Sequence, residues 1–215
     1  MVACGPSVET RRAADTTLAA VVQAKAVIQG GEVMSARREA QAYFESARDS
    51  FLAKSSSGAA NALRDAALFT RQESDSAASP AKEALAKSAD ELDRVATQVA
   101  IGSVASVRQL DHTFARAQLA EAQLHCVRAI DAWNNKNGAA TGAELAMLAD
   151  HFERGASDAG QTLGEATQKS LAGARLVASE LLQGIPVAPV TIDASLAAMD
   201  REVHNLMETA SRLKN

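Results

Sequence analysis

The chain has 215 residues and a net charge of −4, and its Lys and Arg residues are scattered, so it lacks the basic footprint of a nucleic-acid-binding protein. Hydrophobic residues make up 47% of the chain but aromatic residues only 3%, which favours closely packed Ala- and Leu-rich helices over a β-sheet. Two cysteines exclude a disulfide framework, and no apolar run of about 18 residues is present to span a bilayer.

Residues 1–8 are predicted to form an N-terminal tether. Val2-Ala3-Cys4 is followed by Gly5-Pro6-Ser7, and this stretch resembles the end of the lipobox of bacterial lipoproteins. The resemblance implies lipidation of Cys4, attachment to a membrane through that lipid, and a location on the periplasmic face of the cell envelope. A secretory signal has a basic segment and an apolar core of about 7–15 residues before its cleavage site, whereas three residues precede Cys4 here. The alternative is a cytoplasmic protein in which Cys4 is incidental.

Helical periodicity begins near Glu9, is interrupted at Gly30-Gly31, and resumes over residues 36–51 and 59–70. Alanines recur there at steps of three and four, with a Ser/Gly turn at residues 55–58. The segment from Leu18 to Arg71 is similar in style to the alanine-rich, TPR-like hairpins of some small bacterial lipoproteins, although no 34-residue period repeats.

After a polar break at residues 73–79, the pattern predicts a helix of more than fifty residues that begins at Pro80 and ends at the Asn134–Gly138 turn. Gly102-Ser103 lies near a shift in its apolar seam and is a candidate kink. A second long helix is predicted from Thr141 to about Gln183. Four glycines in it suggest close approach of a neighbouring backbone: Gly155, Gly160, Gly164 and Gly173.

A break at residues 184–190 precedes the last predicted helix, which opens at Thr191 or Asp193. Its apolar stripe has the most regular heptad spacing in the chain. We therefore predict an all-α fold, an elongated antiparallel bundle of five to six helices, two of them long, with coiled-coil-like packing. Residues 9–215 would form one domain, with a possible subdivision into a helical hairpin over 9–75 and a long-helix bundle over 79–215. The stripe consists of Ile192, Leu196, Met199, Val203, Leu206, Ala210 and Leu213.

No catalytic motif is found, and the metal signal is weak. Glu121 precedes His125 by four residues, and Asp200 precedes His204 by four, so each pair shares a helix face. Di-iron bundles use Glu-x-x-His steps, which this chain lacks, so we predict no metal site and keep the two pairs as weak candidates. The sequence contains no Cys-x-x-Cys-His for covalent haem, and no cofactor is predicted.

Three further residues are interpreted from their positions, and two of them have both a structural and a functional interpretation. Cys126, within a helical pattern, is typical of a small buried hydrophobe. The single tryptophan, Trp133, closes a bundle end or else anchors a partner. Leu206, in the middle of the last stripe, is covered by this chain's own helices or by a partner molecule.

Three functions stay open from the sequence. The first is a non-enzymatic, lipid-anchored envelope protein that serves as scaffold, adaptor or accessory subunit for an envelope partner through helix–helix contacts. A homo-oligomer is one form that such contacts would allow. The second is a periplasmic bundle that binds a small ligand or cofactor near the glycine-rich residues 155–173. The third is a cytoplasmic coat protein similar in composition to phasins.

Overall fold

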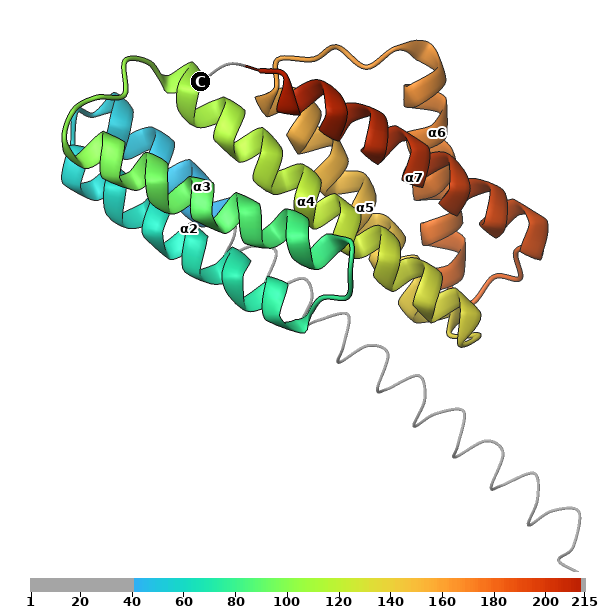
Figure 1. Ribbon diagram of the computed structural model, residues 1–215. Coiled ribbons are helices and arrows are strands. Elements are labelled where there is room, and N and C mark those ends of the chain that lie inside the picture. Colours follow the sequence, from blue (N-terminus) through green and yellow to red (C-terminus); the bar gives the residue numbers. More distant parts are fainter. Residues whose placement is uncertain (1–40, 214–215) are drawn as a thin grey trace, which may run out of the picture. The chain divides into compact units, whose positions relative to one another are not determined.

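The computed structural model describes residues 41–213, and these contain helices and turns but no strand (Figure 1). The chain divides into two units, Met1–Arg37 and Arg38–Asn215, and the described residues belong to the second. The predicted tether over residues 1–8, with Cys4, and the first predicted helix near Glu9 therefore lie outside the described residues. Among the described helices, none combines the length and apolar character needed to cross a membrane.

The described helices match the predicted all-α class, but they are more numerous and shorter than expected. A helical segment covers residues 41–52. The helices that follow are α2 (Ser56–Ser76), α3 (Ala81–Ala100), α4 (Val107–Asn134), α5 (Gly138–Asp158), α6 (Glu165–Leu182) and α7 (Pro189–Ser211). Helix α2 extends through the first half of the predicted polar break, and α7 begins with Pro189, slightly before the predicted start. Coiled-coil-like packing stays a prediction.

The prediction of one helix of more than fifty residues from Pro80 was wrong, because the chain leaves the helix at Gly102. Gly102 has a φ of +70°, a left-handed conformation that favours glycine. Its N–H donates to the carbonyl of Val99, and the N–H of Ser103 donates to that of Gln98. These two bonds form a Schellman motif, which ends α3 instead of kinking a longer rod.

The predicted helix from Thr141 to Gln183 is also broken in two. Gly160 has a φ of +65°, and the N–H of Gln161 donates to the carbonyl of Ala156, so α5 ends as α3 does. A short non-helical link over residues 159–164 then leads to α6. The break at Gly102, which was predicted only as a kink, and the unpredicted break at Gly160 explain why the predicted count of five to six helices was too low.

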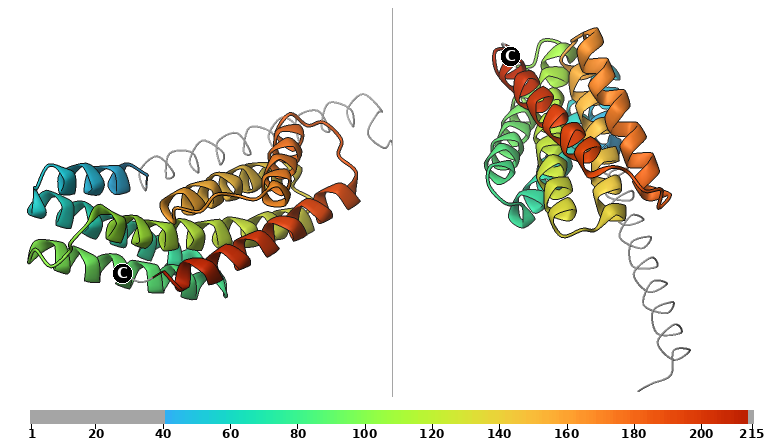
Figure 2. Two further views of the ribbon diagram at one scale, coloured as in Figure 1. Left: turned by 90° about the horizontal axis from the view of Figure 1, so that it is seen from above. Right: turned by 90° about the vertical axis from the view of Figure 1, so that its right-hand side faces the viewer.

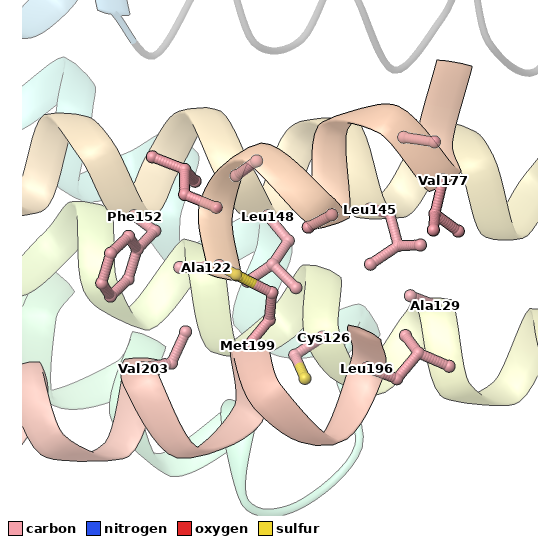
Figure 3. Packing of buried hydrophobic residues seen from close by; sticks show 14 of the residues in the cluster. Ala122, Cys126, Ala129, Leu145, Leu148, Phe152, Val177, Leu196, Met199 and Val203 are labelled. Atoms are coloured by element: carbon pink, nitrogen blue, oxygen red, sulfur yellow. The ribbon is translucent and has the colours of Figure 1, made fainter. Parts of the chain in front are cut away.

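Helix α4 is the centre of the described unit. Helices α2 and α3 form an antiparallel pair that packs toward its N-terminal half, α5 runs along it, and α7 packs on its C-terminal half, while α6 packs on α5 and α7 (Figures 1 and 2). Since neighbours surround it, α4 is buried on nearly every face, including positions occupied by polar residues. Figure 3 shows the larger core, where Met199 of α7 lies among Leu148, Phe152 and Cys126 of α5 and α4.

Of the four glycines predicted to allow close helix approach, one does so. A Cβ at Gly155 would lie 2.8 Å from Cγ of Leu119, so α4 and α5 touch there. Gly160 and Gly164 flank the break, and nothing lies within 4 Å of a Cβ at Gly173. An equally close approach, here to backbone, occurs at Gly142 of α5, where a Cβ would lie 2.8 Å from the backbone oxygen of Ala178 in α6.

These environments predict opposite effects for the same substitution. Gly173→Ala should raise the free energy of unfolding by up to about 1 kcal/mol, because alanine is the better helix former and space is open. Gly142→Ala should lower it by roughly 1–3 kcal/mol, because the new methyl group pushes α5 away from the α6 backbone. Urea unfolding of the two variants measures both values. Equal stabilisation by the two substitutions would contradict the packing of α5 on α6.

Candidate functional site

An open groove runs along one side of α4, between α3 and α7. Its volume is about 290 Å³. Leu119 and Ala120 of α4 line it, together with Ala84 of α3 and with Met207 and Ala210 of α7. Both α3 and α7 run antiparallel to α4 and lie on the same side of it (Figure 2). The groove is therefore lined largely by apolar residues, of which Ala84 and Met207 are partly exposed, whereas Leu119, Ala120 and Ala210 are already buried.

Charged residues of α3 border this groove. Arg116 of α4 donates from Nε to Oε2 of Glu91 at 2.7 Å and from Nη2 to Oε1 at 2.5 Å, a bidentate and partly buried pair. Glu83 and Lys87 line the groove nearer the start of α3, and both are exposed. The groove thus combines an apolar floor with a charged border, which is the usual composition of a protein-binding surface.

A second polar site is buried between α4 and α5. Nδ1 of His125 lies 2.7 Å from Oε2 of Glu144, and the His125 ring stacks on that of His151 at 5.2 Å between centroids. Nδ1 of His151 donates to Oε1 of Gln118 at 2.6 Å, and Gln118 in turn donates to Gln41 at 3.3 Å. These buried groups satisfy one another, so the cluster cross-links helices 41–52, α4 and α5.

Arg48 makes a further polar link from the helix over residues 41–52. Its guanidinium group donates to Oδ1 of Asp111 in α4 and to Oδ1 of Asp158 in α5, each at 2.9 Å, and it lies over the Phe114 ring. Burial raises the pKa of Asp158 to about 6, although the positive charge of Arg48 opposes this shift. This contact therefore links three helices around a partly desolvated carboxyl group.

The structure does not bring the four weak metal candidates together. His125 contacts Glu144, whereas Glu121 is held among groups of α2 and α4. On α7, His204 is exposed and its Nδ1 lies 2.8 Å from the backbone oxygen of Asp200. Within residues 41–213, no group of three or more His, Cys, Asp or Glu side chains is arranged to hold a metal ion.

Glu121 is the least expected of these residues, because its position on α4 is almost fully buried. Oε1 of its carboxyl group has no hydrogen-bond partner among the described residues. Burial raises the pKa of Glu121 to about 8; the charge of Glu73 adds to this effect and that of Arg128 opposes it. Arg128 is itself ion-paired with Glu73 at 3.0 Å. Glu121 is therefore uncharged over most of the physiological pH range.

The structure packs Cys126, Trp133 and Leu206 within this chain. Cys126 is buried, as predicted, and its Sγ lies 3.7 Å from Oδ1 of Asp200. Burial raises the pKa of its thiol to about 12, which makes it a poor nucleophile. Trp133 donates from Nε1 to Oδ1 of Asp193 in the first turns of α7, at 2.7 Å. Leu206 is buried in the larger core.

Comparison of the chain with protein-family models, with curated proteins and with solved structures found no match. Functional inference therefore rests on the residues and their geometry.

Proposed function

We propose that the protein is a non-enzymatic, lipid-anchored scaffold or adaptor of the bacterial cell envelope, which acts through contacts between helices. The observation that carries this proposal is the groove between α3 and α7, an apolar trough with a charged border. The stripe of α7, by contrast, is covered by this chain's own helices. The groove is therefore the surface on which we expect another helix to bind.

Two features support a binding role over a catalytic one. The histidines His125 and His151 contact Glu144 and Gln118 inside the protein, where they cross-link helices. The Cys126 thiol is buried with a strongly raised pKa. The proposed ligand slot near the glycine-rich residues loses support, because the Leu119 side chain occupies the space beside Gly155.

The envelope location rests on the lipobox-like Val2-Ala3-Cys4. When the complete gene is expressed in a bacterial host, the protein should fractionate with membranes, and Cys4→Ser should move it to the soluble fraction. A multiply acylated cysteine holds a protein firmly at a membrane, whereas a single chain binds only marginally.

Cys126→Ala is the matched control for this experiment, because it removes the other cysteine from a buried position. It should leave the membrane fraction unchanged. Recovery of the unsubstituted protein in the soluble fraction would contradict lipid anchoring, and so would membrane association of the Cys4→Ser variant.

A further inference from the structure

The face of α3 beside the groove has an alternating charge pattern. Glu83, Lys87, Glu91 and Arg94 follow one another at steps of four, four and three, so they lie along one side of the helix. Glu83, Lys87 and Arg94 are exposed, and Glu91 is half-buried. The signs along this face are therefore negative, positive, negative and positive.

These charges are available to a binding partner to different degrees. Neither Glu83 nor Lys87 forms an ion pair among the described residues, although their spacing would allow them to pair with each other. Arg94 contacts Glu91 at 3.3 Å, but Glu91 is half-buried and its carboxylate also accepts the two bonds from Arg116, so it keeps that pair in a complex. Arg94 contacts Gln98 at 3.2 Å on the exposed helix surface. Exposed contacts of this kind are weak and are readily exchanged for others.

The charge pattern of one α3 helix is complementary to that of a second α3 helix that runs in the opposite direction. If two α3 helices lie antiparallel about a twofold axis near Ser88 and Ala89, Glu83 of each copy faces Arg94 of the other. Lys87 of each copy then faces Glu91 of the other. A parallel arrangement in register would instead place identical charges opposite each other. In a twofold interface every contact occurs twice, so four attractive pairs form.

We propose that the face of α3 and its adjoining groove bind a second copy of this chain, with the two α3 helices antiparallel across a twofold axis. Each α3 then lies over α4 of the other copy, against the partly exposed Ala84 and Met207 of the groove. Burial of these two apolar side chains adds affinity, while the charge pairs select the orientation and register. The inference rests on the proposed function, because it names the occupant of the same groove.

The charge pattern makes the proposal testable by reversal and rescue. The full chain, with a mass of 22.4 kDa, should have twice that mass in solution by light scattering. Glu83→Arg places two positive charges opposite each other at both ends of the interface, and Arg94→Glu places two negative charges there. Each substitution should raise the dimer Kd by at least about tenfold. Circular dichroism should show unchanged helix content, since both residues are exposed.

Variants that restore opposite charges across the interface then distinguish this interface from any other. The double variant Glu83→Arg/Arg94→Glu should regain the dimer, and an equimolar mixture of the two single variants should form a heterodimer. A monomeric unsubstituted chain would overturn the proposal, and so would a Glu83→Arg variant with an unchanged dimer Kd or a double variant that stays monomeric. None of these results depends on Cys4, so failure of the lipid anchor is distinguishable from failure of the interface.

Discussion

Glu121→Gln should stabilise the protein strongly at pH 8 and above. Burial raises the pKa of this carboxyl group from 4.5 to about 8, so the folded protein keeps a proton that the unfolded chain releases. Between pH 4.5 and about 8 the free energy of unfolding therefore falls as pH rises, and above pH 8 the full penalty remains. The loss in the free energy of unfolding that Glu121 causes above pH 8 is at most roughly 5 kcal/mol. Glutamine keeps the shape of the uncharged acid but cannot ionise.

Urea unfolding of both proteins at pH 5.5, 7 and 8.5 measures this effect. The difference in the free energy of unfolding should be small at pH 5.5 and should grow with pH. Asp65→Asn is the control, because it removes an exposed negative charge from α2 and should leave the pH dependence unchanged. A Glu121→Gln variant with the same pH dependence as the unsubstituted protein would show that Glu121 is charged in the folded state.

Leu206→Asp should lower the melting temperature sharply. Leu206 is buried in the larger core, in the stripe of α7 that packs toward α4 and α5. A carboxylate there would stand inside an apolar cluster, so the substitution loses apolar burial and adds the cost of desolvating a charge. We expect a loss of roughly 3–5 kcal/mol in the free energy of unfolding.

Asn205→Asp is a matched control, since it adds the same charge one residue earlier, where the side chain is exposed. Its melting temperature should change little. Thermal unfolding followed by circular dichroism compares the two. A Leu206→Asp variant with an unchanged melting temperature would contradict the placement of the α7 stripe in the core.

Helix type and most boundaries could be predicted because they depend on local spacing. The stripe of α7 and the turn at residues 134–138 are both where the periodicity predicted them. The spacing of apolar residues could not predict that the helices end at Gly102 and Gly160, because apolar residues continue on both sides of each glycine. A glycine inside a helical pattern is compatible with a kink, a close approach or a C-terminal cap, and tertiary packing selects among them.

The candidate site was less predictable than the fold. Gln118, Glu121 and His125 recur at helical spacing along α4, and such a polar stripe is ordinarily solvent-exposed. Here it is buried because neighbours surround α4, which no local pattern reveals. The partners of these residues come from distant positions, such as Glu144 for His125 and Gln41 for Gln118. The groove likewise exists only because α3 and α7 flank the same side of α4.

Spin labels on α3 test most directly whether this groove is the surface through which the protein assembles. A nitroxide on Lys87→Cys, in a Cys4→Ser background, lies close to the proposed twofold axis, and the buried Cys126 is protected from labelling. Packed helices have axes about 8–10 Å apart, so the continuous-wave electron paramagnetic resonance spectrum should show dipolar broadening from the short distance between the two labels of a dimer. Labels on Leu176→Cys of α6, which does not border the groove, should be much farther apart. Absence of a short distance between labels at position 87 would contradict assembly through this groove.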